Sequence, residues 1–132
     1  MAKEGSLFIE KDLDGDEHDS DTSCECEYKN YVEKIVRINR EVFLLSLLLQ
    51  RNMCGYELIK KIFLKWDVLL SQGTVYPVLY SFEDEGILRA EFGRGDMRTK
   101  IYSLTPEGRE VAQKRVEDFI KAVEQMRLLM KK

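Results

Sequence analysis

The feature that most constrains the fold of this chain is a run of eight residues, 42–49, in which every residue but Ser46 is apolar. Hydrophobicity on nearly all sides indicates a buried helix, around which other elements must pack. The run is far shorter than the roughly 18 apolar residues that a membrane-spanning helix needs. We therefore expect a globular protein built around this helix, with no membrane partner.

The size of the chain fits a single domain with an appendage, since it has 132 residues, of which 44% are hydrophobic. Its first residues do not show the basic and then apolar pattern of a secretion signal. The cysteines are three, Cys24, Cys26 and Cys54. An odd number without an export signal favours reduced thiols, so we expect a cytoplasmic protein.

Charge is unevenly distributed along the chain. Residues 1–27 hold ten acidic and two basic side chains, and the remainder holds 14 acidic and 19 basic ones, from totals of 24 and 21. The net charge of −3 alone argues against nucleic-acid binding, but the body of the chain is mildly basic. We expect residues 1–27 to be an acidic leader that is disordered or loosely ordered, because it has little to bury.

Three helices are predicted in the first two-thirds of the body. Apolar residues recur at helical spacing through residues 28–51, and a second helix is expected over residues 56–66. A third helix, over about residues 72–85, follows Ser71 as its N-cap and carries Pro77 in its first turn. Its apolar face consists of Val75, Val78, Leu79 and Phe82.

A β-hairpin is predicted after the third helix. Gly86 is suited to the left-handed conformation that ends many helices. Two strand-like segments, residues 87–92 and 100–104, are separated by a turn that contains Gly93 and Gly95. Two short strands joined by a glycine-containing turn are typical of a hairpin.

A long helix is predicted from Pro106 to about residue 130, with Thr105 as its N-cap. Six of its apolar residues are alternately four and three positions apart, which is a coiled-coil seam: Ala112, Val116, Phe119, Val123, Met126 and Met130. The seam could pack on its own domain, but we favour pairing with a second copy of the chain. We therefore divide the chain into the leader 1–27, a domain 28–105 and a C-terminal dimerisation helix 106–132.

The order of these elements predicts a winged helix-turn-helix. The fold class is mainly α with a small β-hairpin wing (α+β), extended by the C-terminal helix. In this arrangement the third helix enters the major groove and the hairpin lies on the DNA backbone. We therefore expect a homodimeric regulator that binds double-stranded DNA, with residues 72–85 as recognition helix and 93–100 as wing.

The side chains predicted to face outward suit DNA. On the third helix they can bond base edges or contact sugars and thymine methyl groups: Gln72, Thr74, Tyr76, Pro77, Tyr80 and Ser81. Arg94, Arg98 and Lys100 of the wing supply cations for phosphates. Further lysines on the second helix could add to them: Lys60, Lys61 and Lys65. The alternative is a winged helix that serves as a protein-interaction module without operator binding.

Four segments of the sequence resemble the PadR family of transcriptional regulators. They are Gly-Tyr-Glu-Leu at 55–58, Gly-Thr-Val-Tyr-Pro-Val-Leu at 73–79, Glu-Gly-Ile-Leu at 85–88 and Lys-Ile-Tyr-Ser-Leu-Thr-Pro-Glu-Gly at 100–108. The resemblance covers about residues 40–130. It implies a dimer joined through the C-terminal helix that acts as a repressor at a pseudo-palindromic operator, and in some relatives releases DNA when a small-molecule effector binds.

The resemblance also implies which residues face DNA: Ser71, Gly73, Thr74, Tyr76, Pro77, Arg98 and Lys100. This sequence departs from the family pattern in two places. Tyr80 and Ser81 stand where basic residues are frequent, and residues 83–85 are acidic. Both departures weaken the expected attraction of the helix for phosphate, which leaves more of that role to the wing.

Metal binding by the leader is not expected. Asp12, Asp14 and Asp16 have the alternation of a calcium loop, but the glycine required at its sixth position is Glu17 or Asp19 here, depending on the starting aspartate. His18 with the two leader cysteines lacks the usual Cys-x₂-Cys spacing of a zinc site. No cofactor is expected either.

Two other functions agree less well with the sequence. An enzyme has little support, because the single histidine lies in the leader and no glycine-rich phosphate loop follows a strand. The leader could fold onto the basic face and compete with DNA, since their charges are opposite, but a solubilising tail is the favoured interpretation.

Overall fold

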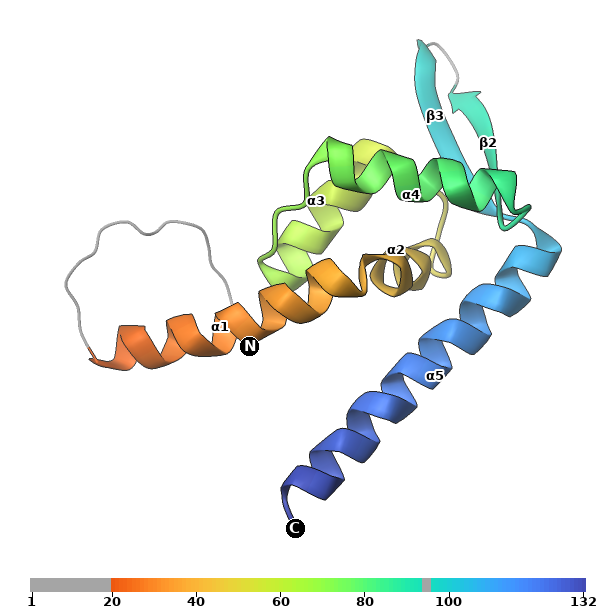
Figure 1. The fold of residues 1–132 in the computed structure, drawn as a ribbon. Helices are drawn as coiled ribbons and strands as arrows, with labels where there is room; N and C mark the ends of the chain where they lie inside the picture. The colour runs from red at the N-terminus through yellow and green to blue at the C-terminus, as the bar shows by residue number, and fades with distance from the viewer. Residues whose placement is uncertain (1–19, 94–95) are drawn as a thin grey trace.

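The computed structural model describes the backbone of residues 20–93 and 96–132, and the side chains of residues 27–93 and 99–132. Helices and a small antiparallel sheet alternate in the order α1 (Ser20–Ile38), α2 (Arg40–Leu48), β1 (Met53–Cys54), α3 (Gly55–Trp66), α4 (Gln72–Asp84), β2 (Leu88–Gly93), β3 (Asp96–Leu104) and α5 (Pro106–Met130) (Figure 1). The winged helix-turn-helix class predicted from the sequence is confirmed, with a long C-terminal helix.

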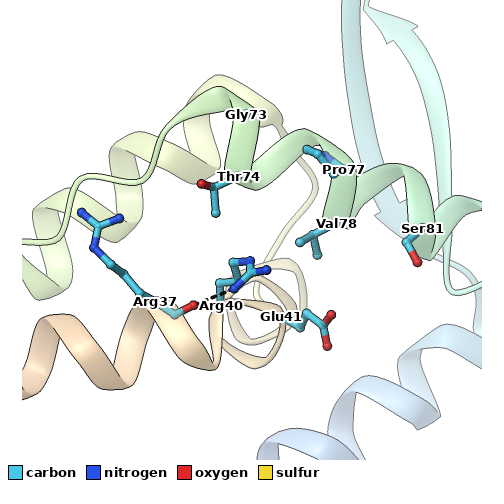
Figure 2. Close-up of a pocket in the computed structure, with 8 residues that line it drawn as sticks. All are labelled: Arg37, Arg40, Glu41, Gly73, Thr74, Pro77, Val78 and Ser81. Carbon is cyan, nitrogen blue, oxygen red and sulfur yellow. Dashed lines mark hydrogen bonds between the residues drawn. The ribbon is translucent and has the colours of Figure 1, made fainter.

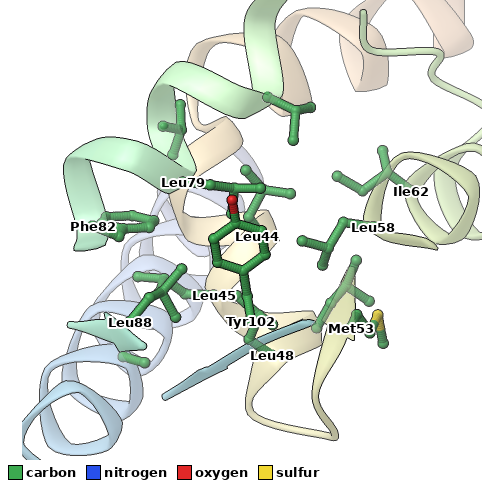
Figure 3. Close-up of a cluster of buried hydrophobic side chains, with 14 of the residues drawn as sticks. Leu44, Leu45, Leu48, Met53, Leu58, Ile62, Leu79, Phe82, Leu88 and Tyr102 are labelled. Atoms are coloured by element: carbon green, nitrogen blue, oxygen red, sulfur yellow. The ribbon is translucent and has the colours of Figure 1, made fainter. Parts of the chain in front are cut away.

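The core forms around α2, as its apolar run predicts. Four leucines of this helix are buried, Leu44, Leu45, Leu47 and Leu48. Tyr102 of β3 is fully buried and stands in the middle of the cluster, with residues of α3 and α4 around it (Figure 3). Burial raises the pKa of Tyr102 to about 12, because desolvation disfavours the ionised hydroxyl.

The first helical stretch differs from its prediction in its continuity and in its start. The continuous pattern through residues 28–51 is two helices, because α1 ends at Ile38 and α2 begins at Arg40. Between them, the side-chain amide of Asn39 donates a hydrogen bond to the carbonyl of Ile35 over 3.0 Å. Helix α1 also begins at Ser20, well before the expected boundary at residue 28.

The sheet contains one strand that the sequence analysis missed. β2 and β3 form the expected antiparallel hairpin, with Leu88 opposite Leu104. β1 adds to the other edge of β3, where Met53 lies opposite Tyr102, so the strand order is β1-β3-β2. β1 ties the start of α3 to the hairpin, and the hairpin projects beyond the helices (Figure 1).

A compact joint connects the end of α4 to the start of α5. Gly86 has a φ of 79°, and the N–H of Ile87 donates to the carbonyl of Phe82, which is the Schellman pattern that its glycine predicts. The hydroxyl of Thr105 donates to the carbonyl of Gly86 over 2.6 Å and accepts from the N–H of Gly108 over 2.9 Å. One side chain thus joins the C-terminal end of α4 to the first turn of α5.

Helix α5 packs on α2 with its N-terminal half only. Ala112 is fully buried, and the ring of Phe119 meets that of Phe43 at a centroid distance of 5.5 Å. Beyond this contact α5 continues away from the body of the molecule (Figure 1). None of the helices in the described part of the chain has the length and apolar character to span a bilayer.

Candidate nucleic-acid interface

Helix α4 begins where its capping residues predict. The hydroxyl of Ser71 accepts a hydrogen bond from the N–H of Thr74 over 3.1 Å, which satisfies one of the free donors at the helix start. Pro77 lies in the second turn and not in the first turn as expected, because the helix begins at Gln72. The missing N–H of Pro77 leaves the carbonyl of Gly73 without its usual helical donor.

Helix α4 has one buried and one exposed side. Its predicted apolar face is confirmed, since Val75, Val78, Leu79 and Phe82 are all buried. On the opposite side, Gly73, Pro77 and Tyr80 are exposed at positions that follow one line along the helix. Gln72 and Ser81 are also exposed, and Thr74 is half-buried. The ring of Tyr80 presents about half of its surface to solvent, at 49%.

Tyr76 is less exposed than the sequence analysis expected. It packs against the core, and a Cβ on Gly55 would lie only 2.5 Å from its ring. The ring therefore lies directly over the start of α3, where only a glycine leaves room for it. Partial burial raises the pKa of the Tyr76 hydroxyl. The rings of Tyr76 and Tyr80 are neighbours, with centroids 6.0 Å apart.

The wing is connected to α4 through Lys100. Its Nζ lies 3.9 Å from Oε1 of Glu83 and 5.5 Å from the centroid of the Tyr80 ring. The predicted wing cation is therefore held against the recognition helix by a carboxylate and an aromatic face. Arg94 lies outside the described residues, and Arg98 belongs to β3 with its side chain outside them.

The three lysines of α3 differ in their exposure and contacts. Lys60 is exposed and Lys61 is half-buried. The Nζ of Lys65 lies 5.3 Å from the centroid of the Trp66 ring. The ring of Phe43 of α2 is nearly perpendicular to the Trp66 ring, with a centroid distance of 4.8 Å. Trp66 is thus partly buried against the core, and Lys65 lies over its ring.

A pocket that the sequence analysis did not foresee lies between α4 and the junction of α1 and α2 (Figure 2). Its volume is about 480 Å³, and its lining combines arginines with the polar side of α4: Arg37, Arg40, Glu41, Gly73, Thr74, Pro77, Val78 and Ser81. The two arginines lie within the predicted helical stretch 28–51, where the pattern of apolar residues says nothing about which polar side chains meet another element.

The predicted seam on α5 divides into two parts. Ala112 belongs to the chain's own core, and Val116 and Phe119 pack within the chain, so this half of the seam needs no second copy. Its other half is exposed, with Val123 at 39%, Met126 at 56% and Met130 at 86%. Four apolar residues of α1 are exposed as well: Tyr28, Tyr31, Ile35 and Ile38.

Metal ligands do not gather in the described part of the chain, where no group of three His, Cys, Asp or Glu side chains could hold an ion. The rejected calcium loop and His18 lie outside the described residues. Cys24 and Cys26 belong to α1, with their side chains outside the described ones.

Comparisons with known proteins identify relatives of this chain. The family model described as "Transcriptional regulator PadR-like family" matches residues 44–114, which is more than half of the sequence. The solved structure of a PadR family transcriptional regulator from Eggerthella lenta is similar with a TM-score of 0.64 at 22% identity, over 83% of this chain and 96% of that one. A transcriptional regulator from Clostridium thermocellum has a TM-score of 0.62 at 24% identity, over 71% and 92% of the two chains. No curated protein sequence matches.

Proposed function

Since the chain belongs to the family of PadR-like transcriptional regulators, we propose that it binds double-stranded operator DNA as a homodimer and represses transcription. The observation that carries this proposal is the exposed line of Gly73, Pro77 and Tyr80 on α4, with the cation of Lys100 beside it. A solvent-exposed helix of this composition next to a β-hairpin has the form of a recognition helix and its wing.

The side chains on and beside α4 have different roles in DNA recognition. Gln72 offers an amide that can donate to and accept from a base edge, and the absence of a side chain at Gly73 permits close approach of the helix to the groove. The ring of Tyr80 contacts sugars or thymine methyl groups. Lys100 leaves Glu83 and binds a phosphate, which positions the helix without reading sequence.

The dimer forms through the exposed half of α5. Val123, Met126 and Met130 continue the seam beyond the body of the chain, and a second copy related by two-fold symmetry would cover them. The same symmetry places two copies of α4 on two half-sites, which are separated by about one helical turn of DNA or a multiple of it. A small-molecule effector bound between the two copies would regulate repression by changing that separation.

The proposal is tested by mixing the protein with fragmented DNA of the source genome at low and moderate salt, and sequencing what is retained. We expect enrichment of a two-fold-symmetric site whose affinity falls steeply with salt. Absence of enrichment at both salt concentrations would contradict DNA binding, and would favour use of the fold for protein interaction.

Replacement of Tyr80 by Ala is expected to weaken binding to the enriched site by about 1–3 kcal/mol and to relax its sequence preference. The reason is that the ring contributes contacts to the groove but no charge. Titration of the labelled operator and of a scrambled duplex measures both effects. The paired variant is Lys100→Gln, which should weaken both duplexes alike and make the salt dependence less steep. If Tyr80→Ala lowered only the salt slope, our assignment of these two roles would be wrong.

Replacement of Glu83 by Gln is expected to strengthen DNA binding about two- to fivefold at low salt, which is the size of one exposed ion pair. The substitution releases Lys100 and removes a negative charge next to the groove. Fluorescence anisotropy with a labelled duplex measures the affinity, and Glu117→Gln on the exposed surface of α5 is the matched control. A loss of affinity would instead mean that the carboxylate of Glu83 itself accepts a hydrogen bond from a base.

A further inference from the structure

Among the described residues that line the pocket beside α4, Arg40 is the one with a buried side-chain donor that has no hydrogen-bond partner. Its Nη1 donates to the carbonyl of Arg37 over 2.9 Å, whereas its Nε is buried and has no hydrogen-bond partner among the described residues. A guanidinium has five N–H donors, and burying one of them unpaired is unfavourable. Because Nε is shielded from solvent, an acceptor in the pocket can pair with it only after the Arg40 side chain rotates, and the side chain then gains free energy because its free donors are taken up.

Arg37 is held in place by different partners. Its Nε donates to Oε2 of Glu33 over 2.8 Å, and its Nη2 donates to the carbonyl of Leu69 over 3.1 Å. Glu33 neutralises Arg37, but no carboxylate of the described residues forms an ion pair with Arg40. Glu41 also lines the pocket, and in Figure 2 its carboxylate points away from the guanidinium of Arg40. Arg40 is thus the available cation, and Arg37 supports it.

Arg40 caps the C-terminal end of α1 through the carbonyl of Arg37, but its position is unfavourable for α2. It is the first residue of α2, and the partial positive charge at a helix N-terminus disfavours a cation there. The same partial charge favours an anion nearby. An anion in the pocket would therefore meet both the guanidinium and the positive end of α2.

The pocket and the wing lie on opposite sides of the exposed line of α4. Lys100 approaches α4 at Tyr80 and Glu83, and the pocket borders it at Thr74 and Ser81. Figure 2 shows Arg40 on the side of α4 that faces α1 and α2, with the hairpin behind the helix. A helix in the major groove has a sugar–phosphate strand on each side, because the groove is only about 12 Å wide. The strand that does not meet the wing would pass the pocket.

We propose that Arg40, supported by Arg37, binds a backbone phosphate of the DNA strand on the side of α4 opposite the wing. This inference rests on the proposed DNA binding. Thr74 and Ser81 line the same pocket, and their hydroxyls, which bond Ser71 and Glu85 in the free protein, are of the type that often completes phosphate contacts. Each half-site is then held at both edges of the groove, by Lys100 on one strand and Arg40 on the other.

The test is the salt dependence of duplex binding by Arg40→Gln. Each phosphate contact contributes about 0.9 to the slope of log K against log salt, so the loss of one contact per protomer should reduce the slope of a dimer by about two units. Operator and scrambled duplex should weaken by the same factor, about tenfold or more at low salt. Arg40→Lys keeps the charge and should retain most of the slope. Arg115→Gln on α5, which removes an exposed arginine remote from α4, is the matched control and should leave the slope unchanged.

The outcomes separate this inference from the proposed function. If Arg40→Gln lowers the thermal midpoint but keeps the wild-type slope, Arg40 only caps the end of α1 and the inference is overturned, while DNA binding stands. If the wild-type protein binds no duplex, both are overturned. A reduced slope with an unchanged thermal midpoint supports the phosphate contact.

Discussion

Replacement of Gly108 by Ala should destabilise the domain by about 3 kcal/mol and lower its thermal midpoint by roughly 10 °C or more. A Cβ at this position would collide with the backbone carbonyl oxygen of Ile87 and lie 2.7 Å from its carbon. Backbone atoms of a short connection cannot move aside as a flexible side chain can. The N–H of Gly108 also completes the cap of Thr105, so displacement of α5 breaks that hydrogen bond too. Thermal and urea unfolding followed by circular dichroism measure the effect.

The matched control for this substitution is Gly73→Ala. Gly73 also lies in the first turn of a capped helix, but a Cβ there would meet only the hydroxyl oxygen of Ser71, at 3.8 Å. Alanine is the better helix former, so we expect a change of zero to about 1 kcal/mol in the stabilising direction. Equal stability of Gly108→Ala and the wild-type protein would show that α5 does not approach Ile87 as closely as described.

Replacement of Met126 by Asp should convert the proposed dimer to monomers, weakening association at least about 100-fold. Met126 is exposed in a single chain and lies in the middle of the free half of the seam, where the symmetric interface would bury two carboxylates. Sedimentation equilibrium measures the change from twice the chain mass to the chain mass. Affinity for the whole operator should fall as well, because a monomer engages only one half-site.

Two features make Met126 the cleaner position for this experiment. Phe119 lies on the same seam, but its contact with Phe43 means that a charge there would damage the chain's own packing. Gln125→Asp places the same charge one residue away, off the seam, and should leave the mass of the dimer unchanged. If Met126→Asp remained dimeric, we would look for the interface on the exposed apolar side of α1, which includes Tyr28 and Tyr31.

The parts of the fold that follow from local rules were predictable from the sequence. Ser71 and Thr105 begin helices because their hydroxyls replace missing backbone acceptors within three residues, and Gly86 ends α4 because it tolerates a positive φ. The buried face of α4 follows from helical periodicity alone. These signals depend only on residues that are close together in the sequence, so they can be detected in a single sequence.

The parts that depend on distant contacts were not predictable in the same way. β1 has only two residues, too few to show the alternation of apolar and polar residues that indicates a strand, and it exists because it pairs with β3. The break at Asn39 interrupts a stretch whose apolar spacing continues through it. The burial of Ala112 depends on α5 lying against α2, which the spacing of the seam could not distinguish from pairing with a second copy.

The candidate site likewise contains residues that local sequence rules predict and residues whose position depends on distant contacts. The exposure of Tyr80 follows from its position opposite the apolar face of α4, and the structure agrees. The partial burial of Tyr76 depends on Gly55, which lies twenty-one positions earlier in the chain. Arg40 could not be singled out because it lines the pocket beside α4 directly after the helix break at Asn39, which the sequence did not reveal. The residues around an arginine in the sequence do not indicate whether it lies between two helices in the fold.

The hydrogen bonds of Thr105 have a consequence for the length of the operator. This hydroxyl bonds both the end of α4 and the start of α5, so a change in the angle between the two helices would break a hydrogen bond. In the proposed dimer, two such joints would set the distance and the angle between the two copies of α4. One base pair inserted between the half-sites rotates one of them by about 35° around the duplex axis, since B-DNA has 10–10.5 base pairs per turn. The tolerance of the operator to such an insertion therefore reports the stiffness of this joint.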